Sequence, residues 1–502
     1  MASEHFDVLV VGAGISGICA AYHLQTSCPD RTYAILEARD DIGGTWDLFR
    51  YPGIRSDSDM YTLGYSFKPW TNPKAIADGW SIVEYLRETA NEYGIDRHIR
   101  FGHRVRRAAW STAEARWTVD VDRDDRPEVA HFTCNFLFMC SGYYDYAEGF
   151  TPEFPGTARF RGRIVHPQKW TRDVDYAGKR VVVIGSGATA VTLVPEMAKE
   201  AAHVTMLQRS PTYIVSMPAE DVIANWLRRW LPARLAYGLT RWKNVLLGMA
   251  FFRFCRRSPE RARALITKWL TKELGPDYDV GTHFNPRYNP WEQRLCLVPD
   301  SDLFDALRRG RASVVTDQIE TFTETGLKLR SGASLDADLI VTATGLNLLF
   351  LGGLEVTVDG AHVEFAKTFG YKGMMFSDVP NLALAIGYTN ASWTLKAELI
   401  CRYVCRLLNH MTAKGMRQCT PRLRGARLEG APFLDLTSGY IQRHIQKFPK
   451  QGLKIPWRLY QNYARDLMML QRGSVEDGVV EFSNPARAGG HRHEDRGLVA
   501  AG

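Results

Sequence analysis

Two glycine-rich turns, each between an apolar strand and a helix, constrain the fold of this 502-residue chain most strongly. The first turn reads G-x-G-x-x-G over residues 12–17, and the second reads G-x-G-x-x-A over residues 185–190. The apolar strands predicted beside them are 7–11 and 33–36 for the first turn, and 180–184 and 204–207 for the second. Two such strand–helix–strand units predict an α/β fold with two doubly wound, Rossmann-like sheets of parallel strands, each carrying a dinucleotide site.

The first turn has the residues that a pyrophosphate site requires. Backbone N–H groups can approach a phosphate closely there, at the positive end of a helix dipole. Glu37 ends the second strand, where a carboxylate can hold both ribose hydroxyls and would repel a 2′-phosphate. The unit therefore predicts an FAD or NAD site rather than an NADP site. The candidate ligand-binding residues of this turn are Gly12, Gly14, Ser16 and Gly17.

The second turn is followed by a strand that ends in Gln208, Arg209 and Ser210, with no acidic residue. A cation and a hydroxyl at this position suit the 2′-phosphate of NADPH. One FAD site and one NADPH site on the same chain are therefore predicted. The candidate residues of the second turn are Gly185, Ser186, Gly187, Ala188, Thr189 and Ala190.

Two further segments have residues suited to chemistry. The loop 43–57 combines glycines with Trp46, which can flank a flat ring system, and ends in Asp57. The segment 288–299 is apolar and bounded by prolines, yet it contains Arg294, which predicts an anionic partner. The candidate cofactor-contacting residues of the loop are Gly44, Thr45, Trp46, Asp47 and Asp57.

The net charge of +8 is concentrated in one segment, because residues 218–275 contain twelve Lys or Arg and only four Asp or Glu. Apolar residues at 223, 226, 227, 230 and 231 follow helical spacing, so an amphipathic helix is predicted there. The segment has two interpretations, a helical insertion that covers a substrate entrance and a peripheral contact with a membrane. No nucleic-acid recognition motif accompanies it, so nucleic-acid binding is not expected.

The nine cysteines form no C-x-x-C pair and no zinc pattern, so reduced thiols and no metal site are expected. The chain starts without a leader-like segment, and no apolar run approaches the ~20 residues of a membrane span. A cytoplasmic protein is expected, with the peripheral membrane contact as an open possibility. The sequence leaves the oligomeric state open.

The stretch before the second turn has the pattern F-x-G-x-x-x-H-x-x-x-W, formed by Phe160, Gly162, His166 and Trp170. It resembles the fingerprint of the class B flavin-dependent Baeyer–Villiger monooxygenases. Residues 43–57 resemble a second signature of that family, [A/G]-G-x-W-x-x-x-x-[F/Y]-P-[G/M]-x-x-x-D, at every specified position. The resemblance extends from residue 6 to about 480 and is closest to the ethionamide-activating subgroup.

The resemblance implies an FAD-containing monooxygenase that uses NADPH and O2 and inserts one oxygen atom next to a ketone carbonyl, to give an ester or a lactone. It also implies oxygenation of sulfur, in thioamide-type compounds for example. The implied substrate is a small apolar ketone or sulfide. Arg294 would stabilise an anionic flavin peroxide, Asp57 would orient Arg294, and His166 and Trp170 would couple the two domains. The resemblance also implies contacts of Arg55 and Val105 with the flavin cofactor.

Two positions depart from the family pattern. The residue after Trp170 is usually proline or aspartate, and here it is Thr171. The lysine that often precedes the catalytic arginine and contacts the 2′-phosphate is replaced by Gln293. The NADPH preference then depends more on Arg209 and Ser210, which predicts weaker discrimination against NADH.

The predicted domains are an FAD-binding part over 1–150, an NADPH-binding domain over 151–340 and a second FAD part over 341–485. The helical insertion lies at about 218–275, and a disordered tail is predicted over 486–502. Three alternatives remain. One is a heteroatom-hydroxylating flavin monooxygenase, and one is a lipid-binding protein with vestigial cofactor sites. The third, a flavin disulfide reductase, is disfavoured because no redox-active cysteine pair is present.

Overall fold

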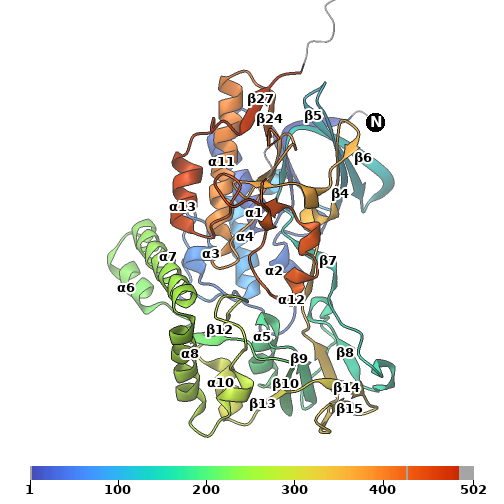
Figure 1. The fold of residues 1–502 in the computed structure, drawn as a ribbon, viewed down its shortest axis with the longest axis vertical. Coiled ribbons are helices and arrows are strands. Elements are labelled where there is room, and N and C mark those ends of the chain that lie inside the picture. The colour runs from blue at the N-terminus through green and yellow to red at the C-terminus, as the bar shows by residue number, and fades with distance from the viewer. Residues whose placement is uncertain (1–2, 426–427, 486–502) are drawn as a thin grey trace, which may run out of the picture.

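The computed structural model of the chain describes residues 3–425 and 428–485, so the predicted tail at 486–502 lies outside the described residues. Two large sheets lie toward opposite ends of the long axis, and the N-terminus lies beside the upper one (Figure 1). Each sheet contains one of the predicted glycine-turn units.

The upper sheet has nine strands and is mixed rather than wholly parallel. Strand β1 (Glu4–Val11) pairs in parallel with β2 (Tyr33–Leu36) and with β6 (Arg126–Met139). Strands β4 (His103–Ser111), β5 (Arg116–Arg123) and β6 pair antiparallel, because the short turns between them can join only antiparallel neighbours. The prediction of parallel strands is therefore wrong for this half of the sheet. The remaining strands are β3 (Ile99–Arg100), β19 (Glu355–Val358), β20 (Ala361–His362) and β23 (Leu382–Leu384).

The lower sheet has five strands, all parallel, as predicted. Its strands are nearly continuous apolar runs, which is typical of a sheet covered on both faces. In order across the sheet they are β13 (Ala312–Thr316), β10 (His203–Gln208), β9 (Arg180–Ile184), β17 (Leu339–Thr342) and β8 (Arg163–Val165). A small antiparallel sheet beside it contains β14 (Ile319–Phe322), β15 (Gly326–Leu329) and β16 (Ser334–Asp336).

Each large sheet has its own apolar core and its own helices. In the upper unit α1 (Ile15–Ser27) packs against α11 (Trp393–Ala413), and in the lower unit α5 (Ala188–Met197) packs against α10 (Asp302–Arg308). The shorter or flanking helices are α2 (Thr45–Leu48), α3 (Met60–Leu63), α4 (Gly79–Glu92), α9 (Val280–His283), α12 (Gly439–Gln442) and α13 (Tyr463–Leu467).

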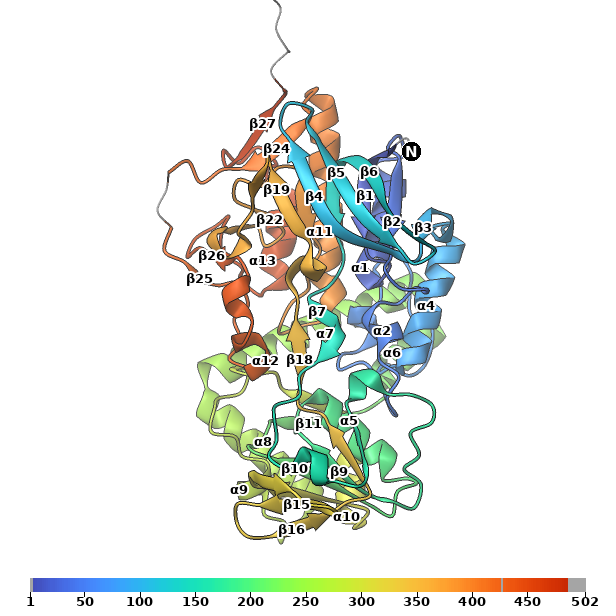
Figure 2. The same ribbon diagram turned by 90° about the vertical axis from the view of Figure 1, so that its right-hand side faces the viewer.

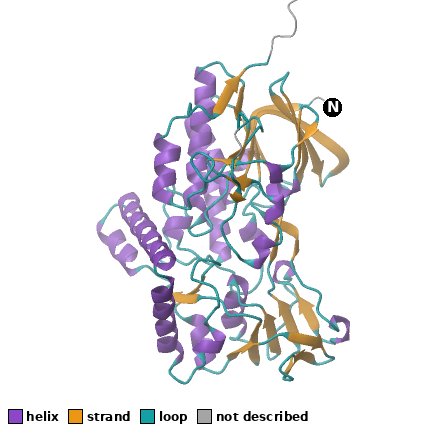
Figure 3. Ribbon diagram, viewed as in Figure 1, coloured by secondary structure: helices purple, strands orange, loops and turns teal. Residues whose placement is uncertain are grey.

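The predicted insertion is helical. It consists of α6 (Val222–Trp230), α7 (Ala233–Arg257) and α8 (Pro259–Leu274). Helices α6 and α7 form a hairpin that extends sideways from the body of the molecule, as Figure 3 shows most clearly. Within the described ranges, no helix is both long enough and apolar enough to cross a membrane.

One small sheet lies along the chain segments that join the large units (Figure 2), and a second lies at the two ends of the helical insertion. Strands β7 (Tyr144–Gly149) and β18 (Leu346–Leu348) pair antiparallel, so both crossings between the units run side by side. Strands β11 (Ile214–Met217) and β12 (Cys296–Pro299) pair in parallel above α5. The C-terminal region adds the short pairs β21 (Gly370–Tyr371) with β22 (Met375–Phe376), β24 (Gln418–Pro421) with β27 (Val480–Ser483), and β25 (Ala431–Pro432) with β26 (Lys450–Gln451).

Candidate functional site

The two glycine turns have the geometry of phosphate-binding helix starts. Gly14 caps α1 and Gly187 caps α5, and neither cap has a side chain that accepts a hydrogen bond from the first turn. The N–H groups there are therefore available to an anion. A side chain at Gly17 could not be accommodated, since its Cβ would lie 1.8 Å from the Gly12 carbonyl oxygen. Both turns fit a dinucleotide pyrophosphate.

Glu37 is buried at the end of β2 and is held by backbone N–H groups. Ala13 N donates to Glu37 Oε2 at 2.7 Å, and Arg39 N donates to Oε1 at 2.9 Å. Burial raises the pKa of this carboxyl, and the two backbone bonds oppose that rise. Each oxygen keeps a second acceptor position, so the carboxylate can also accept from ribose hydroxyls.

The loop after β2 is fixed by charged pairs. Asp47 is buried and accepts from Arg39 Nη2 at 2.5 Å and from Arg50. Thr45 and the half-buried Trp46 lie at the start of α2, and Thr45 Oγ1 is 3.0 Å from Tyr146 Oη. These residues can wall a flat ring bound beside the first turn.

The structure locates Arg55 and Val105 away from one another. Arg55 Nη1 lies 2.5 Å from Asp302 Oδ2 in α10, so this arginine links the upper unit to the lower one. Val105 lies on β4, opposite Val121 of β5. The predicted flavin contacts of both residues stay predictions.

The second turn opens onto exposed polar side chains. Ser186 Oγ donates to Ser210 O at 3.1 Å and lies 2.9 Å from Thr212 Oγ1. Arg209 and Ser210 are exposed at the end of β10, and among the residues that the structure describes no carboxylate forms a salt bridge with Arg209. The guanidinium is therefore available to a phosphate.

Arg294 and Asp57, far apart in sequence, form an ion pair with Arg294 Nη2 2.5 Å from Asp57 Oδ2. About a third of each side chain is accessible, 33% for Arg294 and 34% for Asp57. Asp57 is the main reason that the pKa of Arg294 is raised, while burial opposes the rise. The guanidinium therefore stays positively charged.

A tight turn positions Arg294. Asn289 N and Nδ2 both donate to Glu292, each at 2.9 Å, and Glu292 N donates to Asn289 O at 3.0 Å. Trp291 has a positive φ of 69° in this turn. The resulting loop is held from the C-terminal side by Thr437, whose N and Oγ1 both donate to Glu292 O at 2.9 Å.

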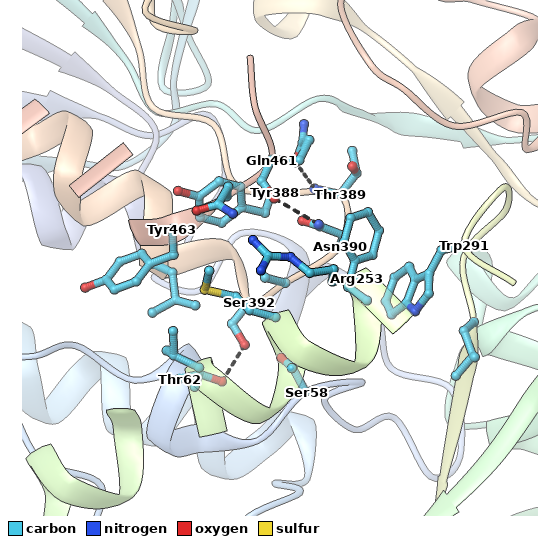
Figure 4. Close-up of a pocket in the computed structure, with 18 of the residues that line it drawn as sticks. Ser58, Thr62, Arg253, Trp291, Tyr388, Thr389, Asn390, Ser392, Gln461 and Tyr463 are labelled. Atoms are coloured by element: carbon cyan, nitrogen blue, oxygen red, sulfur yellow. Dashed lines mark hydrogen bonds between the residues drawn. The ribbon is translucent and has the colours of Figure 1, made fainter. Parts of the chain in front are cut away.

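The pair opens into a cavity of about 380 Å³ between the upper unit, α7 and the C-terminal region. Figure 4 shows Arg253 reaching from α7 into the cavity, with Trp291 on one side and Tyr388 and Tyr463 on another. The far half of α7 thus forms a wall of the cavity, and the interpretation of the insertion as the cover of a substrate entrance stays a prediction. The apolar part of the lining includes Val245, Met249, Phe252, Trp291 and Leu295.

Three site residues were not singled out from the sequence. Trp393, the first residue of α11, donates its indole N–H to Ser16 Oγ at 2.8 Å. Lys396 Nζ lies 3.1 Å from Asp466 Oδ2, and both side chains are fully buried. Tyr388, which lines the cavity, also donates to Asp466 Oδ2 at 2.7 Å. Two signals in the sequence pointed to this segment. Residues 387–393 follow a predicted strand and precede a predicted helix, which could return the chain to the flavin, and residues 388–396 resemble the ethionamide-activating subgroup.

The fingerprint residues lie outside the cavity, at the crossing between the units. His166 Nε2 is 3.2 Å from Gly345 O, and the other ring nitrogen accepts from Gln168 N at 3.1 Å. A Cβ at Gly149 of β7 would lie 2.0 Å from the His166 ring, so the ring packs directly on the first crossing strand. Burial lowers the pKa of His166. The neutral imidazole therefore contacts both chain segments that cross between the units, at Gly149 and at Gly345.

The other fingerprint residues are structural supports of the lower unit. Phe160 packs against Phe322 with ring centroids 6.4 Å apart, and Gly162 lies directly against the Phe160 ring. Trp170 packs edge-on against Tyr176. Thr171, the departure from the family pattern, accepts through Oγ1 from Arg163 Nη2 at 3.3 Å, and its backbone carbonyl accepts from Val174 N at 3.2 Å.

Known proteins provide an independent comparison. A family model described as flavin-binding monooxygenase-like matches residues 6–226. The FAD-containing monooxygenase EthA of Mycobacterium tuberculosis is 56% identical over 489 residues, which cover 97% of this chain and 100% of that protein. The EthA of Mycolicibacterium smegmatis is 52% identical, with 96% of this chain and 98% of that protein covered.

Solved structures have the same fold. An oxidized steroid monooxygenase bound to NADP matches with a TM-score of 0.76 at 24% identity, covering 96% of this chain and 100% of that chain. An open crystal structure of cyclohexanone monooxygenase matches with a TM-score of 0.73 at 21% identity and the same coverage. The predicted fold class is confirmed.

The two glycine-turn units, with a cavity beside the upper one, have the arrangement of a dinucleotide-dependent oxidoreductase. With relatives more than 50% identical over almost its whole length, the chain belongs to the flavin-binding monooxygenase-like family. The prediction of a flavin-dependent monooxygenase is confirmed.

Proposed function

We propose that this chain uses FAD, NADPH and O2 to insert one oxygen atom next to a ketone carbonyl, giving an ester or a lactone, and that it also oxygenates sulfur. FAD binds along the first glycine turn, Glu37 and the loop 44–57. NADPH binds along the second turn. The relatives named as FAD-containing monooxygenases and the structural relative bound to NADP support this assignment.

The ion pair between Arg294 and Asp57 in the wall of the cavity carries the proposal. When bound, the reduced flavin supplies the electrons that activate dioxygen. Arg294 holds a permanent positive charge at the cavity, where negative charge develops during oxygen transfer, and Asp57 fixes its orientation at 2.5 Å. Such a preorganised charge costs no reorganisation during the reaction.

NADPH preference rests on Arg209 and Ser210, which lie exposed at the end of β10 beside the second turn. A guanidinium and a hydroxyl can both donate to the 2′-phosphate. Gln293, in place of the usual lysine, adds no charge, so discrimination against NADH is weaker than in relatives with that lysine.

The substrate is a small apolar ketone or sulfide. The cavity of about 380 Å³ has apolar side chains in its wall that suit such a molecule. Its charged lining residues are the Arg294–Asp57 pair together with Asp59, Arg253, Arg256 and Arg257. His166 couples the two units, because it contacts both crossing segments. The boundaries 1–150, 151–340 and 341–485 follow these crossings and remain our proposal.

Replacement of Arg294 by alanine tests the proposal. We expect Arg294→Ala to bind FAD and to be reduced by NADPH at a normal rate, yet to give no ester and to release hydrogen peroxide instead. The matched control is Arg287→Ala, an exposed arginine of the same segment that lies outside the cavity lining. Full ester formation by Arg294→Ala would remove this residue from the reaction.

A second candidate function is oxygenation of nitrogen or sulfur without a physiological ketone. The apolar part of the cavity lining, which includes Val245, Met249 and Phe252, can hold a sulfide or an amine as well as a ketone. Parallel assays with a simple ketone and a simple sulfide distinguish the two. Sulfoxide formation without ester formation would favour this second function.

A further inference from the structure

The short helix α6 turns its apolar face outward. Amphipathic surface helices normally pack this face against the protein core. In α6, however, Trp226 is 59% exposed and Trp230 is 74% exposed. Val222 and Ile223 are also exposed, and Ala224 is the one residue of the helix that is fully buried.

Helix α7 also exposes apolar side chains, while its opposite face is firmly anchored; one of them, Trp242, also packs against Tyr463 with ring centroids 5.7 Å apart. Its outward residues recur at helical spacing, and they are Leu235, Leu239, Trp242 and Leu246. On the inner face the buried Arg241 donates through Nη1 to Tyr61 O at 2.9 Å and to Gly64 O at 2.7 Å. The bonds of Arg241 fix α7 against the body of the protein, and we call the exposed apolar residues of α6 and α7 the hairpin patch.

The hairpin has an excess of positive charge, although Glu220 and Asp221 directly precede α6 and Asp221 Oδ2 lies 2.6 Å from Lys243 Nζ. Residues 222–257 contain no Asp or Glu and eight Lys or Arg. Of these, Arg229 and Arg234 are exposed close to the turn between the two helices. Tryptophan beside arginine suits the boundary of an anionic bilayer, where the ring lies at headgroup depth and the cation meets lipid phosphate. A symmetric contact between two copies of the patch would instead bring like charges together.

The position of the hairpin fits contact with a flat surface. Figures 1 and 3 show α6 and α7 extending from the side of the molecule, away from both large sheets. The far half of α7 lines the cavity through Asn244, Met249, Phe252 and Arg253. One continuous helix therefore joins the hairpin patch to the cavity wall.

We propose that the α6–α7 hairpin is a membrane-docking element that holds the cavity at an anionic lipid surface. An apolar substrate dissolved in the bilayer then reaches the cavity along α7. Membrane binding requires no catalytic turnover, so its measurement tests this proposal independently of the proposed oxygenation.

Vesicle flotation of the purified, FAD-loaded protein tests the proposal. Vesicles of phosphatidylcholine with phosphatidylglycerol should carry the protein upward, and vesicles of phosphatidylcholine alone should carry about tenfold less. The double variant Trp226→Ser, Trp230→Ser and the double variant Arg229→Glu, Arg234→Glu should each lower the bound fraction by about tenfold. FAD content and the NADPH oxidation rate of both variants should match those of the unmodified protein, because none of these side chains lines the cavity.

Matched controls use the upper sheet. Phe101→Ser with Val129→Ser removes two exposed apolar side chains there, and Arg104→Glu with Arg107→Glu makes the same change of charge. Both controls should float like the unmodified protein. Absence of flotation, or equal losses in the controls, would overturn the proposal. Light scattering gives the oligomeric state. If the unmodified protein were a dimer and the double variant Trp226→Ser, Trp230→Ser a monomer, a second copy of the chain, and not a membrane, would cover the patch.

Discussion

Trp393 donates its indole N–H to Ser16 Oγ across 2.8 Å, and this bond joins the start of α11 to the first glycine turn. The ring also packs against Tyr143, with centroids 5.3 Å apart. Ser16 lies in the first turn of α1, where an anion would meet the helix. A residue from the C-terminal part of the chain thereby supports the cofactor site of the N-terminal part.

This bond predicts a coupled effect on FAD affinity. Trp393→Phe keeps the ring but removes the donor, and Ser16→Ala removes the acceptor. One hydrogen bond contributes ~1 kcal/mol, so each variant should weaken FAD binding by roughly fivefold. The double variant should bind FAD no more weakly than whichever single variant has the lower affinity. Flavin fluorescence titration of the apoprotein measures the three affinities. If the fold-losses in FAD affinity of the two single variants multiplied in the double variant, the two residues would act independently and the bond would not support the site.

Arg209→Ala should change the cofactor preference. The loss of a charge-assisted bond to the 2′-phosphate should raise the KM for NADPH by about tenfold or more. NADH lacks this phosphate and acts as the internal control, so its KM should stay within about twofold. Steady-state kinetics with both nucleotides measure the difference. Equal increases would exclude Arg209 as the 2′-phosphate ligand.

The buried pair of Lys396 and Asp466 should stabilise the loop that lines the cavity only while both charges are present. Lys396→Met leaves Asp466 buried without its cation, which should lower the free energy of unfolding by ~3–5 kcal/mol. Adding Asp466→Leu should recover most of the loss, because no buried charge remains. Urea unfolding of the three proteins measures this.

The exposed pair of Lys367 and Glu364 is the control for that experiment. Lys367→Met should change the free energy of unfolding by less than ~1 kcal/mol, since water already screens this pair. Equal losses from Lys396→Met and Lys367→Met would contradict the structural role of the buried pair.

His23 predicts a loss of stability in mild acid. Burial lowers its pKa from 6.5 to about 4, and nearby Glu398 offsets only part of the shift. Between these two values the unfolded chain binds a proton that the folded chain does not. Stability should therefore fall as the pH drops from 6.5 to 4, by at most ~1.4 kcal/mol per pH unit from this group.

Substitution of His23 measures this contribution. The Tm of His23→Gln should fall less steeply than that of the unmodified protein between pH 7 and pH 4.5. Parallel Tm curves for the unmodified protein and His23→Gln would show that His23 does not govern this range.

Much of the fold could be predicted from local sequence because backbone geometry demands it. The turn at Gly12–Gly17 permits no side chain at Gly17, and buried parallel strands read as apolar runs. The ion pair of Arg294 with Asp57 was also predicted, through the resemblance and the need of an arginine in an apolar, proline-bounded segment for an anionic partner.

Other features depend on tertiary contacts and were missed. Helical spacing predicts α6, but the period of a helix does not tell which way its apolar face points. The partner of Lys396 is Asp466, far along the chain, and no local pattern joins them. The antiparallel pairing of β4, β5 and β6 was missed because the prediction of parallel strands rested on the two glycine-turn units alone, and these three strands lie outside both units.

The origin of the oxygen atom in the product tests the central claim most directly. The protein is given NADPH and a simple cyclic ketone under 18O2, and the product is analysed by mass spectrometry. We predict a lactone with one 18O atom, and no lactone from Arg294→Ala although NADPH is still consumed. An unlabelled lactone, or NADPH consumption by the unmodified protein without any lactone, would contradict the account.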